Sequence, residues 1–390
     1  MDNIQFDTRL EQLIGNGVKD RFLNEYWERD YFHAHSYSRE SIKFNIQDLE
    51  TVLACSRLTS NDLRLSSVDQ EVLPIQYCEK DGTVKLQQAF FYFNRGSTII
   101  IRSIENFNPQ LRKLCFDLKA EFGNIKRIFI NLYLTPEGSQ GFFHHYDRED
   151  VFILQIYGEK EWYLYDSPLP LPLEDQGFSS STVPDQNRLK KLVLKPENAL
   201  YIPRGMIHEA KAQSGISCHL TISLVPFTWY DVIKEYHVEL SHSNVSLRKS
   251  IPKTITEKDL TNHLNSVAKL NSKILRKVLN KMKFSYNDQL LNQFNIEGKL
   301  TEQRTITDQN LIVGLNSSLF KGHSIIGNTI EMKIGLTSVL LPLQAKSIVE
   351  YILKNRKCKI KDIPSEYKNK GKMMIINRLI RDSFLLLVNE

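Results

Sequence analysis

The residues with the clearest chemical potential stand close together in "GFFHHYDREDVFILQIYGEKEWYLYD", residues 141–166. His145 and Asp147 are separated by one residue, so on a strand both side chains point to the same side. A neutral imidazole and a carboxylate presented together, with a second histidine from elsewhere, form the 2-His-1-carboxylate set that binds Fe(II) and leaves positions open. The spacing therefore predicts a metal site that a distant histidine must complete.

His208 is the best candidate for that third ligand, because it follows a β-type run and a Pro-Arg-Gly turn in "ENALYIPRGMIHEA". Two other histidines compete with it. His144 is adjacent to His145 and is expected to face away, and His219 lies inside "SCHLTISL" without a preceding turn. We interpret both of these histidines as structural.

Lys160 is the candidate for an anion-binding residue. It lies across a hairpin from Asp147, just after the turn at Gly158, and it shares strand parity with Trp162. A lysine that faces the interior needs a buried anion, and the distal carboxylate of a 2-oxoglutarate cosubstrate would provide one. The alternatives are a turn lysine that reaches solvent, or a different cation, Arg204 of the Pro-Arg-Gly turn.

Short β-type runs between about residues 85 and 230 must position these groups. Gly, Pro and Asn separate the runs, as in an antiparallel sandwich or barrel. The runs are "QQAFFYFN", "STIIIRS", "RIFINLYLT", "DVFILQIYG", "KEWYLYD", "KLVLKPENALYIP" and "SCHLTISLVPF". A helix is expected at 108–123, and residues 1–84 form a mixed leader. We therefore predict a mainly β fold with α-helices, in a first domain at 1–230.

Two further modules are expected after the β-rich region. Apolar residues between 260 and 282 follow helical spacing, which predicts a helical module at 231–335. That module either covers the barrel or forms a dimer contact. In the last fifty residues, two apolar helix patterns are followed by a strand pattern, which is the outline of a winged-helix-like domain at 336–390.

Bulk properties describe an ordinary globular protein. The chain has 390 residues, of which 41% are hydrophobic and 25% charged, and its start resembles no signal peptide. The five cysteines show no CxxC spacing, so we predict a reducing compartment, the cytoplasm, and no membrane association. Residues 351–390 hold ten Lys or Arg and four Asp or Glu, which suits a solvated surface or an acidic partner.

Three stretches carry a family resemblance. "INLYLTPEGSQGFFHHYDREDVFILQIYGEKEWYLY", "LKPENALYIPRGMIHEA" and "CHLTISL" resemble the JmjC-type cupin oxygenases of the ribosomal oxygenase family. That family includes bacterial arginine hydroxylases and human histidine hydroxylases that act on ribosomal proteins. The resemblance implies a double-stranded β-helix, the JmjC or cupin jelly roll, followed by a helical dimerisation module and a C-terminal winged helix.

The resemblance also implies residue roles. His145, Asp147 and His208 would bind Fe(II), and Lys160 would bind the distal carboxylate of 2-oxoglutarate. The remaining matches are Asn131 and Ser223 in the cosubstrate pocket and Tyr133 facing the substrate. His144 departs from the family pattern, in which another residue, often Pro, precedes the metal histidine.

The expected activity is hydroxylation of a protein side chain, Arg or His, with Fe(II) as the metal and with 2-oxoglutarate and O2 as cosubstrates. A ribosomal protein is the leading substrate, and the enzyme is expected to be a homodimer. A hydroxylase that tailors a peptide natural product and a protein demethylase are alternatives with the same chemistry. A nucleic-acid-binding regulator with a ligand-sensing cupin is the alternative from another class. Glu350 and a moderate basicity in the first helix of the winged-helix-like domain favour a structural role or ribosome affinity instead.

Overall fold

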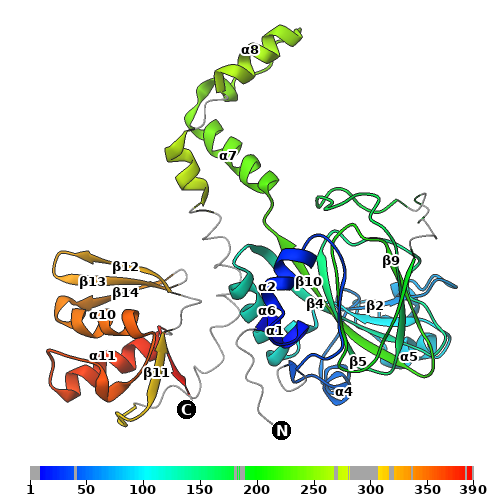
Figure 1. Cartoon of the computed structure of the whole chain (residues 1–390), viewed down its shortest axis with the longest axis horizontal. Coiled ribbons are helices and arrows are strands. Elements are labelled where there is room, and N and C mark those ends of the chain that lie inside the picture. The colour runs from blue at the N-terminus through cyan, green and yellow to red at the C-terminus, as the bar shows by residue number, and fades with distance from the viewer. Residues whose placement is uncertain are drawn as a thin grey trace. The chain divides into compact units, whose positions relative to one another are not determined.

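The structure is a computed structural model, and it describes residues 9–38, 42–179, 182, 184, 189–267, 271–279, 281, 306–315, 320–334, 337–382 and 384–388. The chain divides into two units, Met1–Phe227 and Thr228–Glu390. Figure 1 shows the helices and strands of both units. Within the described residues, every helix is too short or too polar to cross a membrane.

Two antiparallel sheets form the framework of the first unit. The larger sheet has seven strands in the order β1 (Phe32–Ala34), β8 (Ala199–Ile202), β5 (Asp150–Tyr157), β10 (Ser217–Pro226), β4 (Ile125–Thr135), β3 (Thr98–Ile101) and β2 (Leu63–Ser66). The smaller sheet has the order β7 (Lys190–Leu194), β6 (Lys160–Leu164) and β9 (His208–Ala212). These sheets confirm the expected mainly β fold with α-helices. β9 was not among the predicted strands.

The register of the larger sheet decides which side chains share a face. β10 pairs with both β4 and β5, and Thr221 lies opposite Asn131 and Ile153. Because side chains alternate along a strand, Tyr133 and His219 lie on this same face, two residues further along. β5 and β10 are almost wholly buried, which explains the apolar run of β5. β10 instead alternates apolar residues with Ser217, His219, Thr221 and Ser223.

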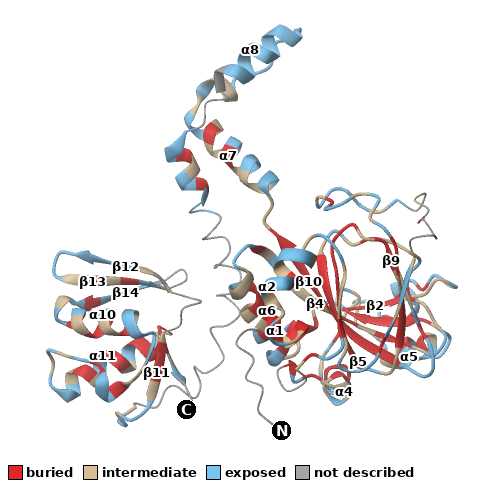
Figure 2. Cartoon of the chain, in the orientation of Figure 1, coloured by how far each residue is buried: buried red, intermediate tan, exposed pale blue. Residues whose placement is uncertain are grey.

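Among the described residues of the first unit, the segments outside the two sheets contain the helices α1 (Arg9–Ile14), α2 (Lys19–Arg21), α4 (Ile46–Cys55), α5 (Leu86–Phe93) and α6 (Pro109–Phe122). α6 matches the predicted helix. The Asn108 side chain caps its start by accepting the Leu111 N–H, and Gly123 ends it at a φ of 70°. Leu111, Leu114 and Leu118 are buried in the core. Figure 2 shows β10, in the larger sheet, in the red of buried residues.

The prediction of a strand at "QQAFFYFN" is wrong, because this stretch forms α5. Ala89 and Phe93, one helical turn apart, are buried in the core, whereas Phe90 and Phe91 are 36% and 43% exposed. Aromatic residues favour strands only as a tendency, and here burial of one helical face overrides it.

Helices follow in the second unit: α7 (Trp229–Ser243), α8 (Glu257–Val267) and a helical stretch at 272–279. Ile274 and Val278 are buried against Tyr236 and Leu240 of α7. The predicted apolar face is therefore divided, because Leu260 and Leu264 are 48% and 54% exposed. Met282, the end of the predicted pattern, lies outside the described residues.

The rest of the second unit contains two three-stranded sheets and two helices. The sheets are β15 (Lys357–Lys359), β11 (Ile312–Leu315) and β16 (Leu385–Val388), and β12 (Phe320–Ile326), β13 (Thr329–Ile334) and β14 (Thr337–Pro342). The helices are α10 (Lys346–Asn355) and α11 (Asn369–Arg381). The predicted order of helix, helix and strand at the end of the chain is present. The boundaries 231–335 and 336–390 and the winged-helix class stay predictions.

Candidate metal centre

Two chain segments meet at the candidate metal ligands. His145 forms an isolated antiparallel bridge with His208, the first residue of β9. The bridge has two backbone hydrogen bonds, from the His145 N–H to the His208 carbonyl at 3.0 Å and from the His208 N–H to the His145 carbonyl at 2.7 Å. Asp147 lies in the loop before β5 rather than on a strand, and its carbonyl accepts the Gly205 N–H at 3.0 Å. These bonds bring the three residues to one place.

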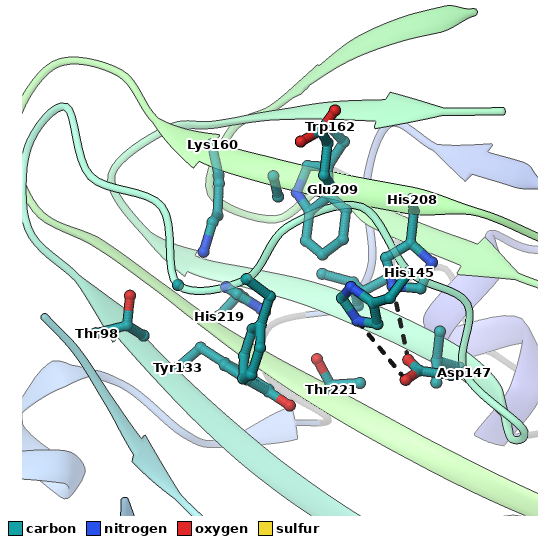
Figure 3. Close-up of a pocket in the computed structure, with 15 residues that line it drawn as sticks. Thr98, Tyr133, His145, Asp147, Lys160, Trp162, His208, Glu209, His219 and Thr221 are labelled. Carbon is teal, nitrogen blue, oxygen red and sulfur yellow. Dashed lines mark ion pairs between the residues drawn. The ribbon is translucent and has the colours of Figure 1, made fainter. Parts of the chain in front are cut away.

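The three side chains form a metal-binding geometry. One ligand atom from each of His145, Asp147 and His208 lies within 4.8 Å of the other two. Asp147 Oδ1 is 3.8 Å from His145 Nε2, and Asp147 Oδ2 is 3.6 Å from His208 Nε2 (dashed lines, Figure 3). Neighbouring ligands of a metal that binds at about 2.1 Å lie roughly 3 Å apart, so small side-chain movements would suffice. Within the described residues this is the one such group.

Hydrogen bonds determine which ring nitrogen of each histidine is available to bind a metal. Nδ1 of His145 lies 2.8 Å from the Phe143 carbonyl, and Nδ1 of His208 lies 3.1 Å from the Met206 carbonyl. A carbonyl only accepts, so both Nδ1 atoms carry the proton and both Nε2 lone pairs face Asp147. Burial, assisted by the neighbouring His145, lowers the pKa of His208 to about 4, which keeps this imidazole neutral.

A pocket of about 230 Å³ extends from these three residues to Lys160. Figure 3 shows Lys160 at the opposite end of the pocket from the two histidines. The Lys160 side chain is 4% exposed, and its Nζ donates to Thr135 Oγ1 at 3.0 Å, which also accepts from Thr98 Oγ1 at 3.2 Å. Burial lowers the pKa of Lys160 to about 7. Among the described residues, no carboxylate pairs with this buried amine.

Aromatic side chains form the wall between the two ends. The rings of Tyr133 and His219 stack with centroids 4.8 Å apart, and Trp162 meets His219 edge-on at 5.5 Å. Burial lowers the pKa of His219 well below its usual range, with a smaller contribution from Lys160. His219 Nδ1 and Trp162 Nε1 are buried without a hydrogen-bond partner in the described part of the chain. His219 therefore belongs to the pocket rather than to a purely structural position.

Asn131 and Ser223 lie on the pocket-facing side of the sheet, yet neither is among the described residues that line the pocket. Asn131 Oδ1 accepts the Ser103 N–H at 3.1 Å, so the oxygen of this side-chain amide already has a partner in the loop after β3. Ser223 is 5% exposed and lies opposite Val151, which does line the pocket. Tyr133 lines the pocket directly.

His144 and Arg204 serve other contacts. His144 faces away from the metal ligands, with Nε2 3.2 Å from the Thr182 carbonyl and its ring edge-on to Phe178. Arg204 is 6% exposed and pairs with Asp150, so its guanidinium is not free to serve as the cation of the pocket. The structure therefore favours Lys160 over Arg204 at the end of the pocket away from the histidines.

Among the polar residues in and around the pocket, Thr98, Thr135, Glu209, His219 and Thr221 were given no site role by sequence reasoning. The alternation of side chains along a strand could have predicted the position of three of these residues. Thr135 follows Asn131 and Tyr133 at two-residue steps on β4, and Thr221 and His219 share one face of β10. Thr98 comes from β3, and only the pairing of that strand with β4 brings it near.

Comparisons with known proteins agree with this geometry. The sequence profile described as the JmjC domain matches residues 105–232. The chain is 30% identical over 253 residues to "Bifunctional lysine-specific demethylase and histidyl-hydroxylase NO66" of Drosophila persimilis, covering 62% of this chain and 36% of that protein. It is 30% identical over 283 residues to "Ribosomal oxygenase 2" of Rattus norvegicus, covering 66% of this chain and 58% of that protein.

Both relatives are longer proteins, and this chain spans less than two thirds of each. Among solved structures, the Escherichia coli ribosomal oxygenase YcfD, in complex with cobalt and succinic acid, is similar with a TM-score of 0.50. The match covers 97% of this chain and 99% of that one at 12% sequence identity, so it supports the fold alone. The matched JmjC domain and the similarity to the two relatives support the resemblance of this chain to the JmjC-type cupin proteins of the ribosomal oxygenase family.

Proposed function

We propose that this protein is an Fe(II)- and 2-oxoglutarate-dependent oxygenase that hydroxylates a protein side chain. The observation that carries the proposal is one pocket with a His-Asp-His group at one end and a buried lysine at the other. A ligand with an anionic end and a metal-chelating end would use both.

His145, Asp147 and His208 would hold the metal. Their donor set, two imidazole nitrogens and one carboxylate, suits Fe(II) and leaves coordination positions for other ligands. The Nδ1–H bonds to backbone carbonyls orient both rings and raise the basicity of Nε2, as is usual for metal-bound histidines. When bound, such a metal supplies the activation of O2 that inserts one oxygen atom into a C–H bond as 2-oxoglutarate becomes succinate and CO2.

Lys160 would bind the distal carboxylate of 2-oxoglutarate. A buried ammonium requires an anion, and a charge-assisted hydrogen bond to a carboxylate is strong. Thr135 would share the carboxylate with Lys160, because its hydroxyl already touches Nζ. Asn131 and Ser223, on the same face of the sheet, would complete the polar surroundings of the cosubstrate. Tyr133 would face the substrate near the metal.

A polypeptide is the proposed substrate. The names of the relatives refer to ribosomal oxygenase and histidyl-hydroxylase activities, which favours Arg or His of a ribosomal protein. One relative is also named a lysine-specific demethylase, so demethylation is the second candidate with the same metal chemistry. A tailoring hydroxylase for a peptide natural product and a nucleic-acid-binding regulator with a ligand-sensing cupin are the alternatives with less support.

Assembly and location complete the proposal. The helical part of residues 231–335, in α7 and α8, would form a dimerisation module, since Leu260 and Leu264 expose apolar surface on α8, and the enzyme would be a homodimer. The last part of that range is not helical as expected, because it contains the strands β11, β12 and β13. Residues 336–390 would form a winged-helix-like domain with a structural role or ribosome affinity. The cytoplasm remains the predicted location.

The test is a search for the product. The full chain, loaded with Fe(II), is incubated with 2-oxoglutarate, O2 and lysate from cells that lack it, and the peptides are analysed by mass spectrometry. We expect a gain of one oxygen on one Arg or His of a ribosomal protein, and no gain with His208→Ala. Loss of a methyl group would establish a demethylase. Succinate formation stimulated by a small metabolite and by no polypeptide would refute the polypeptide substrate.

A further inference from the structure

A buried ion-pair cluster lies beside the candidate metal centre. Arg204 Nη1 is 2.6 Å from Asp150 Oδ2 and 2.7 Å from Glu28 Oε1. The Tyr201 hydroxyl donates to Asp150 Oδ1 at 2.7 Å and accepts the backbone N–H of Glu28 at 2.8 Å. Asp150 is fully buried and Arg204 is 6% exposed. The polar groups of these four residues bond to one another, so we interpret the cluster as a structural support and not as a binding site.

The position of the cluster in the chain relates it to the metal ligands. Asp150 is the first residue of β5, three residues after Asp147, and Arg204 lies four residues before His208. The ion pair therefore joins the same two segments that the backbone bonds of the metal centre join. Because Arg204 is the middle residue of the Pro-Arg-Gly turn, the ion pair restrains the turn that precedes His208.

Stability alone explains this cluster poorly. Burial raises the pKa of Asp150, and the neighbouring Arg204 offsets this effect only in part. Buried ion pairs add little net stability compared with apolar residues of the same size, although loss of one partner is costly. Glu28 also adopts a left-handed backbone with a φ of 59°, which is unfavourable for a residue with a side chain. The buried ion pair and the left-handed backbone of Glu28 both cost folding free energy. Such features are expected where the geometry of a site matters more than the stability of the fold.

We propose that the Arg204–Asp150 pair positions the metal ligands, because it fixes the separation of the two ligand-bearing segments before a metal binds. The guanidinium has a rigid planar shape, so two carboxylates around it hold definite directions. Glu28 is the third member and makes the N-terminal segment part of the support for the metal centre. The inference rests on the proposed function, since the spacing matters only if His145, Asp147 and His208 hold a metal.

The test measures binding of Co²⁺ to the full chain, by the visible absorption of the bound ion and by its dissociation constant. We expect Arg204→Met to weaken Co²⁺ binding about tenfold, within the range known for groups that orient metal ligands, and to alter the absorption spectrum. Arg204→Lys keeps the charge without the planar fork, so an intermediate loss is expected. Glu28→Gln should weaken binding by a smaller factor.

Two controls separate positioning from general support of the fold. Leu118→Ala, in the core on α6, should lower the melting temperature without changing the dissociation constant for Co²⁺. The double variant Asp150→Asn/Arg204→Met leaves no unpaired buried charge at this pair, and Asn still accepts the Tyr201 hydroxyl. Its melting temperature should recover relative to Arg204→Met, whereas its Co²⁺ affinity should stay weak.

The outcomes are distinguishable. Wild-type affinity and spectrum in Arg204→Lys and Arg204→Met, or recovery of affinity together with stability in the double variant, would overturn the inference. If Arg204→Met does not fold, Arg204→Lys and Glu28→Gln decide it, and wild-type affinity in both refutes it. If His208→Ala binds Co²⁺ as the wild type does, the proposed metal centre itself is wrong and the inference falls with it.

Discussion

The buried amine of Lys160 makes a quantitative prediction about the pH dependence of folding. Its pKa falls from the ordinary value of 10.5 to about 7 because the side chain is buried. Between these values the unfolded chain binds a proton that the folded chain lacks, so this residue makes the folded protein more stable as the pH rises. Below about pH 7 the folded protein carries the full cost of a buried ammonium.

The magnitude follows from the two pKa values. One pKa unit corresponds to about 1.4 kcal/mol, so the lysine should destabilise the ligand-free protein by roughly 4 kcal/mol at pH 7 and roughly 2 kcal/mol at pH 9. Lys160→Met removes the charge and keeps the length of the side chain. The variant should therefore gain stability over the wild type, and the gain should be about 2 kcal/mol larger at pH 7 than at pH 9.

The assay is urea unfolding of both proteins at pH 7 and pH 9, with a chelator and without 2-oxoglutarate. Groups that titrate in both proteins cancel in the comparison. A gain that is equal at the two pH values would refute the assignment of a depressed pKa to Lys160. Co²⁺-loaded wild type should gain melting temperature from 2-oxoglutarate at pH 7 and Lys160→Met should gain far less, whereas equal gains would place the carboxylate contact elsewhere.

Three further outcomes are expected. Gly205→Ala should destabilise the folded chain by at least about 2 kcal/mol in a melting experiment, because its φ is 89° and an added Cβ would lie 2.2 Å from the Leu169 carbonyl oxygen. A melting temperature equal to that of the wild type would mean that the turn adapts. Light scattering at micromolar concentration should give the mass of a dimer, and a monomer would assign the residues 255–285 to contacts within one chain. Arbitrary duplex DNA should show no salt-dependent shift with the full chain, since a shift would establish nucleic-acid binding.

The metal ligands could be predicted from the sequence because the argument needs only local geometry. His145 and Asp147 are two residues apart, and any extended chain puts such side chains on one side, even though the structure has a bridge and a loop there instead of the expected strand. The choice of His208 as the distant ligand depended on the Pro-Arg-Gly turn that precedes it. The pairing of β9 with β6, which carries His208 to the site, is nonlocal and leaves no pattern in a single sequence.

The errors have the same physical origin. A stretch of aromatic residues was assigned to a strand, because the propensity of each residue outweighed the helical spacing of the two that are buried, Ala89 and Phe93. The division of the apolar face between 260 and 282 depends on which helix packs against α7. The conformation of α5 and the division of this apolar face both depend on contacts between residues far apart in the sequence. Such contacts override local preferences.

The polar atoms around the pocket favour a polar ligand, whatever the similarity to known proteins. Lys160 has one hydroxyl partner, and His219 Nδ1 and Trp162 Nε1 have no partner among the described residues. A buried polar group without a hydrogen bond costs about 1–3 kcal/mol, so two such groups beside a buried amine around one small pocket would destabilise a protein that needed only a core. An apolar ligand would leave that cost in place, whereas a dicarboxylate that reaches from the lysine to the histidines would reduce it. This supports the proposal that Lys160, the three candidate metal ligands and the aromatic wall between them form one site for one elongated anion.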